Sequence, residues 1–174
     1  ALAACLLGSV CGFAHAADIT YNGDEHKSKL TGNDLIPNTP SDNKITVEIT
    51  GTYNQQINSV YGGKSDSSTV SNNIVTLTGT NTIIAGSVLG GSSGDGEVSG
   101  NTVAVQNGAK VTGSVYGGSS TSEAVSNNNV TLTGTDTSIT SFVYGGSSGG
   151  GAVSGNSVTI DNATVGKVVF GGDS

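Results

Sequence analysis

Apolar residues occur in pairs two positions apart along this chain, and the pairs return at nearly constant intervals. The residue between the two members of a pair is threonine or alanine, which is the alternation of a short strand with one buried face. The clearest pairs are Val75/Leu77, Val103/Val105, Val130/Leu132 and Val158/Ile160. The pattern predicts one half-buried strand in each of several similar units.

A second strand is expected where a valine precedes an aromatic residue or leucine. Such valines are Val60, Val88, Val115, Val143 and Val169. Alternation turns these valines inward and their neighbours outward. The predicted outward column is Tyr61, Leu89, Tyr116, Tyr144 and Phe170. Such a column either packs on itself across the units or serves as a docking strip for sugars or a partner strand.

A pair of glycines follows each residue of this outward column. The pairs are Gly62-Gly63, Gly90-Gly91, Gly117-Gly118, Gly145-Gly146 and Gly171-Gly172. Their spacings are 28, 27, 28 and 26 residues, and a period in this range is typical of solenoids, propellers and arrays. Because glycine adopts backbone conformations that other residues avoid, we predict that each pair forms the turn that closes a unit.

An asparagine column lies between the two predicted strands. Its members are Asn73, Asn101, Asn128 and Asn156, each three residues after a valine. Amide side chains stacked along an axis hydrogen-bond to one another, as in cross-β ladders. The column is therefore interpreted as structural, with a row of carbohydrate contacts as the alternative.

These features together predict an all-β fold, a parallel β-helix with coils of about 27 residues. A propeller blade needs about 40 to 50 residues, and no apolar stretch has the period of a helix. The chain has 28 glycines, 5% aromatic and 11% charged residues. That composition suits thin inward columns of valine, isoleucine and leucine, while their regular phase argues against disorder.

The N-terminal residues differ from the repeats. Residues 1–16 are apolar and end in Ala14-His15-Ala16, which predicts a secretory signal peptide that lacks its start. Lipidation at Cys5 is the alternative. Since Cys5 and Cys11 both lie in this segment, the mature chain would contain no disulfide, thiolate metal site or cysteine nucleophile.

Two further segments complete the predicted organisation. Residues 17–54 are interpreted as an N-terminal cap with one degenerate coil, because Asn43, Ile45 and Val47 match the later units. A solenoid needs such a cap to cover its first open edge. Residues 55–174 are expected to form the β-helix repeats, truncated within a repeat.

Candidate chemistry is sparse. Four acidic residues, Asp66, Asp95, Glu97 and Glu123, follow the glycine pairs and are expected in solvated loops. His26 is the one histidine outside the predicted signal, so no catalytic triad or histidine metal site can be assembled. We predict no catalytic residue, no metal and no cofactor. A net charge of −7 without arginine disfavours nucleic acid as a partner.

A family resemblance rests on these features. The apolar N-terminus, Ser-Val-Tyr-Gly-Gly-Ser-Ser at 114–120 and Val-Ser-Asn-Asn-Asn-Val-Thr-Leu at 125–132 resemble the passenger region of a bacterial autotransporter, or a similar type V secreted adhesin. The resemblance implies a right-handed β-helical passenger. It also implies display at the outer membrane by a C-terminal translocator barrel, which would lie beyond this sequence.

The resemblance implies an adhesive role at the bacterial surface. Glycans or proteins of host cells, or of neighbouring bacteria, are the implied ligands, with autoaggregation as one result. We expect many weak contacts along the repeated face, so that avidity determines attachment. The alternatives are a β-helical enzyme acting on polysaccharide, the head of a trimeric adhesin, and a purely structural spacer.

Overall fold

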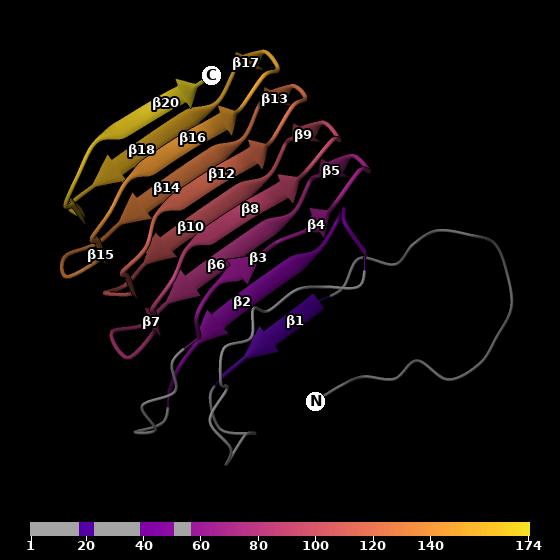
Figure 1. The fold of residues 1–174 in the computed structure, drawn as a ribbon. Helices are drawn as coiled ribbons and strands as arrows, with labels where there is room; N and C mark the ends of the chain where they lie inside the picture. The colour runs from indigo at the N-terminus through magenta and orange to yellow at the C-terminus, as the bar shows by residue number, and fades with distance from the viewer. Residues whose placement is uncertain (1–17, 23–38, 51–56) are drawn as a thin grey trace, which may run out of the picture.

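A computed structural model describes residues 18–22, 39–50 and 57–174 of the chain. Every regular element in these residues is a β-strand, and none is a helix. All paired strands run parallel, and successive coils stack into a solenoid (Figure 1). The predicted all-β solenoid is confirmed. The predicted signal peptide, residues 1–16, with its alternative of a lipidated Cys5, lies outside the described residues.

In the described residues the strands form four parallel sheets. The first sheet has the order β1-β2-β6-β10-β14-β18. These strands span Asp18–Tyr21, Lys44–Glu48, Ile74–Thr78, Thr102–Gln106, Asn129–Thr133 and Ser157–Asp161. The second sheet has the order β3-β8-β12-β16-β20, with β4 also paired to β8. The strands β3, β4, β8, β12, β16 and β20 span Val60–Tyr61, Lys64–Ser65, Val88–Ser93, Val115–Ser120, Val143–Ser148 and Val169–Asp173.

Two narrow sheets join the wide ones. The third sheet contains β7, β11, β15 and β19 at Ile83–Ile84, Lys110–Val111, Ser138–Ile139 and Thr164–Val165. The fourth sheet contains β5, β9, β13 and β17 at Val70–Ser71, Val98–Ser99, Val125–Ser126 and Val153–Ser154. The chain passes through the first, third, second and fourth sheets in each coil, then enters the first sheet again.

The register between coils follows the sequence period. Val60 pairs with Val88, which pairs with Val115, then Val143 and Val169. The offsets are therefore 28, 27, 28 and 26 residues. Because each coil keeps the same register, each residue type of the repeat lines up in a column along the axis.

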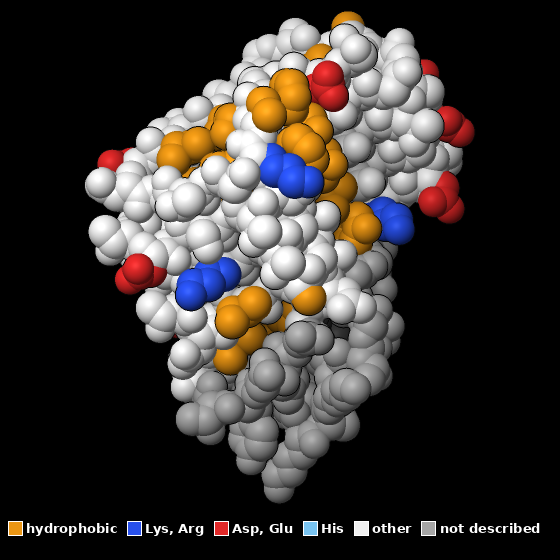
Figure 2. Space-filling view, turned by 60° about the vertical axis from the view of Figure 1, so that its left-hand side comes forward, with side chains coloured by type: hydrophobic (Ala, Val, Ile, Leu, Met, Phe, Trp, Pro, Cys, Tyr) orange, Lys and Arg blue, Asp and Glu red, His pale blue; other side chains and the backbone are white. Residues whose placement is uncertain are grey.

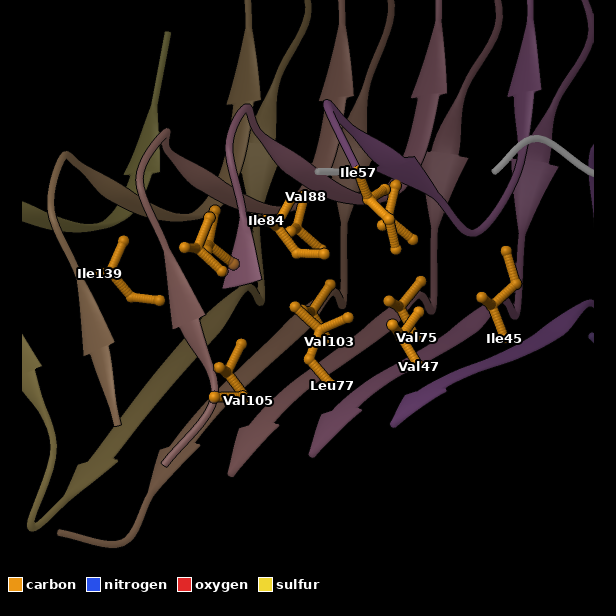
Figure 3. Close-up of a cluster of buried hydrophobic side chains, with 14 of the residues drawn as sticks. Ile45, Val47, Ile57, Val75, Leu77, Ile84, Val88, Val103, Val105 and Ile139 are labelled. Carbon is orange, nitrogen blue, oxygen red and sulfur yellow. The ribbon is translucent and has the colours of Figure 1, made fainter. Parts of the chain in front are cut away.

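The core lies between the first and second sheets. Val75 and Leu77 of β6 are fully buried, and so is Val88 of β8, as the alternation predicts. Figure 3 shows side chains from the first sheet facing those of Ile84 and Val88 across the interior. One aliphatic side chain per strand position is enough to fill this narrow space, so the fold needs no large aromatic core.

The predicted N-terminal cap is described at residues 18–22 and 39–50. Strand β2 pairs with β6 so that Ile45 meets Val75 and Val47 meets Leu77. Strand β1 was not predicted; it pairs with β2 and places Tyr21 beside Val47. Strand β1 lies in the part of the predicted cap where the repeat pattern is not visible in the sequence, and four residues with an alternating Ile19 and Tyr21 are enough to form it.

A continuous ladder of asparagine amides, buried in all but the last coil, runs along the corner between the fourth and first sheets. It comprises Asn43, Asn73, Asn101, Asn128 and Asn156. The Nδ2 of each of the first four donates to the Oδ1 of the next coil, at 2.7, 2.8, 2.8 and 2.9 Å. The backbone N–H of each donor residue also donates to that same oxygen, at 2.9 to 3.0 Å. Each Oδ1 that serves the ladder in this way accepts two hydrogen bonds.

The second Nδ2 hydrogen of the ladder residues binds a carbonyl oxygen. Asn128 donates to Val98 O at 3.2 Å, and Asn156 donates to Val125 O at 3.0 Å. At the N-terminal end Thr39 Oγ1 donates to Asn43 Oδ1 at 2.8 Å. Because ladder amides bind one another and the backbone inside the solenoid, a row of carbohydrate contacts does not fit them.

The glycine pairs correct a prediction. They do not form the turns that close the coils: Gly90-Gly91, Gly117-Gly118 and Gly145-Gly146 lie inside β8, β12 and β16, and Gly171-Gly172 lies inside β20. In the first coil Gly62-Gly63 separates β3 from β4. None of these glycines has a positive φ.

Space, rather than backbone freedom, requires these glycines. A Cβ added to Gly118 would lie 2.6 Å from Nδ2 of Asn128, and one added to Gly91 would lie 2.7 Å from Nδ2 of Asn101. A Cβ on Gly117 would lie 2.3 Å from the carbonyl oxygen of Gly145. The second sheet therefore passes directly over the asparagine ladder, and a side chain on Gly91 or Gly118 would displace an amide.

The left-handed backbone conformation occurs one residue before the asparagine ladder. The φ angles of Asp42, Asn72, Gly100, Asn127 and Gly155 are 59°, 56°, 66°, 56° and 62°. Aspartate, asparagine and glycine are the residues that tolerate this region. This column, and not the glycine pairs, turns the chain from the fourth sheet into the first.

We predict that Asn101→Ala lowers the free energy of unfolding by about 3 to 5 kcal/mol, because it leaves several buried donors and acceptors without hydrogen-bond partners. The N–H and Nδ2 of Asn73 and the Oδ1 of Asn128 would each lose a partner. Urea denaturation followed by circular dichroism measures the change. Asn129→Ala is the control, since this half-buried residue lies outside the ladder; equal losses for the two variants would contradict the ladder's role.

We also predict that Gly118→Ala destabilises the fold by about 2 to 3 kcal/mol through overpacking against Asn128. The matched control is Gly150→Ala, where the nearest atom to an added Cβ is 3.6 Å away. That variant should unfold at the same denaturant concentration as the parent, or slightly higher. A Gly118→Ala protein as stable as the parent would show that the amide has room to move.

Candidate functional site

The outer face of the second sheet carries the predicted outward column. We call this column the aromatic ladder: Tyr61, Leu89, Tyr116, Tyr144 and Phe170. The register places each member beside the next: Tyr61 with Leu89, Leu89 with Tyr116, Tyr116 with Tyr144, and Tyr144 with Phe170. The four aromatic members are partly exposed. Figure 2 shows a band of hydrophobic side chains along the molecule, with lysine side chains next to it.

The rings of the last three members stack face to face. The Tyr116 and Tyr144 centroids are 4.7 Å apart with an interplanar angle of 2°, and those of Tyr144 and Phe170 are 5.0 Å apart at 7°. These separations match the inter-strand spacing of about 4.8 Å. The solenoid geometry thus sets the ring stacking directly.

Two lysines and a further aromatic residue extend this surface. Phe142 lies beside Tyr144, with centroids 6.0 Å apart and a 39° tilt. Lys167 Nζ lies 4.7 Å from the Phe142 centroid, and Lys64 Nζ lies 5.0 Å from that of Tyr61. At these distances the ammonium groups are attracted to the ring faces. Both ends of the aromatic ladder therefore have a cation nearby.

The stacking limits what the aromatic ladder can contact. Both faces of Tyr144 are covered, by Tyr116 and by Phe170. A sugar that stacks on an aromatic face has no access to this ring. The groups turned to solvent are the ring edges and the hydroxyls. The ladder therefore presents a continuous strip of ring edges, without separate ring faces on which a sugar could stack.

A polar column runs parallel to the aromatic ladder, three positions further along each coil. It comprises Lys64, Ser92, Ser119, Ser147 and Asp173. The serines are half-buried, whereas the two charged ends are exposed. This polar column carries a cation at one end of the strip and an anion at the other, with neutral residues between.

The surroundings of Tyr144 favour its neutral form. Burial, the neighbouring Tyr116 hydroxyl and the Asp173 carboxylate, in that order, raise the pKa of Tyr144 above the usual tyrosine value. Asp173 is therefore close enough to act on the Tyr144 hydroxyl, which connects the end of the polar column to the aromatic ladder.

The acidic residues of the sequence lie apart from this strip. Asp66, Asp95, Glu97 and Glu123 are exposed in the loops that lead to the fourth sheet. Ser122 Oγ donates to Asp95 Oδ1 at 3.1 Å. Among the described residues, no three histidine, cysteine, aspartate or glutamate side chains group closely enough to hold a metal ion. The described part of the chain also contains no helix of the length and apolar character needed to span a membrane.

Comparison with protein-family models, with curated proteins and with solved structures found no match to this chain. The β-solenoid is therefore the level at which the chain can be classified.

Sequence reasoning singled out the aromatic ladder but not the residues around it. Alternation from Tyr61 and Phe170 turns Lys64 and Asp173 inward, whereas the structure places both outward. The alternation shifts there because both glycines of a pair face the interior, as Gly90 and Gly91 do against Asn101. The position of Lys167 does not follow from the alternation either, since this lysine lies just before β20. Its contact with Phe142 depends on the fold of the preceding coil.

We predict that Tyr144 ionises at higher pH than a free tyrosine, and that Asp173→Asn lowers its pKa. A raised pKa favours the neutral folded form, so its contribution to stability is complete below the unfolded value near pH 10 and is lost as pH rises through the folded value. Phenolate absorbance during a pH titration measures this, with Tyr144→Phe to assign the signal. Asp136→Asn, on a distant turn, should leave the titration unchanged; an equal shift there would contradict the assignment.

Proposed function

We propose that this chain is an adhesive β-solenoid displayed on a bacterial surface, as in the passenger of an autotransporter. The observation that carries the proposal is the aromatic ladder on the outer face of the second sheet, whose four aromatic members Tyr61, Tyr116, Tyr144 and Phe170 are partly exposed. The resemblance of the N-terminus and of the repeat motifs to autotransporter passengers supports the same assignment. A C-terminal translocator barrel belongs to the proposal, outside this sequence.

The proposed mode of attachment is multivalent. Similar groups recur along the axis, so related contacts are repeated: aromatic ring edges at Tyr61, Tyr116, Tyr144 and Phe170, and serine side chains at Ser92, Ser119 and Ser147. Contacts that are individually weak gain strength when several are made together, because all but the first form at a high effective concentration. Host cells or neighbouring bacteria are the proposed surfaces to which such a strip attaches.

We predict that displaying the full chain on a non-adherent bacterium, fused to a surface anchor, increases attachment to a layer of epithelial cells. Antibody labelling of intact cells confirms display, and counting retained bacteria after washing gives the result. Attachment should fall several-fold with Tyr116→Ser plus Tyr144→Ser, because these substitutions interrupt the aromatic ladder. No gain in attachment by the displayed parent chain would favour a spacer.

The control carries two substitutions on the outer face of the first sheet. Thr131→Ser and Thr159→Ser change β14 and β18 at partly exposed or exposed positions, away from the aromatic ladder. This variant should attach as the parent does. If both variants lose attachment equally, the second sheet is not the adhesive face. Circular dichroism of the purified chains verifies that each variant is folded.

A further inference from the structure

We propose that Tyr116 and Tyr144 form an oxidation site, at which a peroxide-driven one-electron oxidant joins the two rings into a dityrosine cross-link between adjacent coils. The inference goes beyond the adhesive role and does not depend on it. Three observations carry it: the stacking of the two rings, their exposure on the outer face of the second sheet, and the scarcity of other oxidisable side chains.

The solenoid holds the two phenols together before any oxidation takes place. Their ring centroids are 4.7 Å apart and their planes are parallel to within 2°. The parallel pairing of β12 with β16 places the two residues side by side in register. A phenoxyl radical formed on one ring therefore meets the second phenol without diffusion, at a high effective concentration.

Both phenols are accessible to an oxidant. Tyr116 and Tyr144 are partly exposed, and their ring edges and hydroxyls turn to solvent. The bond of dityrosine joins the ring carbons next to the hydroxyls, so it forms at these exposed edges. The two rings have to tilt toward each other to make this bond, and the solvent side of the sheet leaves space for that movement.

The aromatic ladder contains one pair of neighbouring tyrosines. Tyr61 lies beside Leu89, and Leu89 separates it from Tyr116. Phe170 stacks on the other face of Tyr144 but has no hydroxyl. Among the described tyrosines, the fold therefore stacks the rings of a single pair, and a cross-link within one molecule has one expected position.

Few other side chains compete for the oxidant. The chain contains no tryptophan and no methionine. Thiols are readily oxidised, but Cys5 and Cys11 both lie in the predicted signal peptide. Of the remaining tyrosines, Tyr21 is buried, and Tyr53 lies outside the described residues.

The reaction is an oxidation of two phenols. Each phenol loses one electron and its hydroxyl proton, and the two phenoxyl radicals join by a bond between carbons ortho to the oxygens. The ring hydrogens at these carbons then move to the oxygens, which restores both phenols. One hydrogen peroxide accepts the two electrons and two protons and becomes two molecules of water.

The cross-link joins β12 to β16 covalently. Its two residues are 28 positions apart in the chain, so it closes a loop of one coil. Closing such a loop lowers the conformational entropy of the unfolded chain, as a disulfide does. Since the described residues contain no cysteine, an oxidised tyrosine pair gives them a covalent bond between coils that no disulfide can supply.

Peroxidase treatment of the purified full chain tests the proposal. The chain, with its cysteines alkylated, is treated at low concentration with a haem peroxidase and hydrogen peroxide. Dityrosine fluorescence should appear in the monomer fraction. Cleavage at Glu123 separates the two tyrosines, so mass spectrometry should find their peptides joined with the loss of two hydrogen atoms. Absence of this product, or dityrosine confined to dimers, would overturn the proposal.

Tyrosine-to-phenylalanine variants keep the rings and remove the reactive hydroxyls. Tyr116→Phe and Tyr144→Phe should each lower the yield of dityrosine in the monomer at least tenfold. Tyr61→Phe is the matched control from the same column and should leave the yield unchanged. Phe170→Tyr adds a hydroxyl to a ring that stacks on Tyr144 at 5.0 Å and 7°, and should give a second cross-linked peptide that joins positions 144 and 170.

Loss of the product in both Tyr116→Phe and Tyr144→Phe, with retention in Tyr61→Phe, supports the proposal; equal yields in all three variants would overturn it. Urea denaturation gives an independent measurement. The cross-linked monomer should unfold at a higher urea concentration than the untreated chain, whereas treated Tyr116→Phe should show no shift. An equal shift in both proteins would overturn the assignment to this pair. None of these measurements involves attachment, so their failure leaves the adhesive function standing.

Discussion

Buried amides impose the strictest constraint on this solenoid. An asparagine side chain inside a protein is tolerated only when its donors and acceptors are bonded, and here the bonds lie mainly in the adjacent coils. A coil shifted by one residue would lose them all and would turn its aliphatic side chains outward as well. The ladder thus fixes the register at one corner of each coil, and the strands on either side of that corner pair in the same register.

Two other features of the repeat follow from that corner. The glycine pairs leave room for the amides beneath the second sheet, and the left-handed residue before each asparagine aims its side chain into the interior. Because all coils share one register, the outer face is equally regular. The rings of Tyr116, Tyr144 and Phe170 stack on the outside for the same reason that the amides stack inside, since both repeat at the spacing of the strands.

The sequence allowed correct predictions for features that occur in several copies of the repeat. The inward valines, the strand register and the match of Asn43, Ile45 and Val47 to the later coils all follow from phase alone. The glycine pairs were misassigned because glycine signals both a turn and a close approach, and only the positions of Asn101 and Asn128 distinguish the two. Strand β1 occurs once and has no copy to align with. Contacts such as that of Lys167 with Phe142 depend on coil placement, which a linear pattern does not contain.

The asparagine ladder also has a direction. Every oxygen in it faces the preceding coil and every Nδ2 that joins two coils faces the following one, so the two ends of a stack are chemically unlike. At the N-terminal end Thr39 Oγ1 donates to the Asn43 oxygen, where an Nδ2 donates in the later coils. A coil can therefore join this ladder in one orientation only. A coil laid on the stack with its chain direction reversed would oppose donor to donor or acceptor to acceptor, so the amides fix the direction of the solenoid as well as its register.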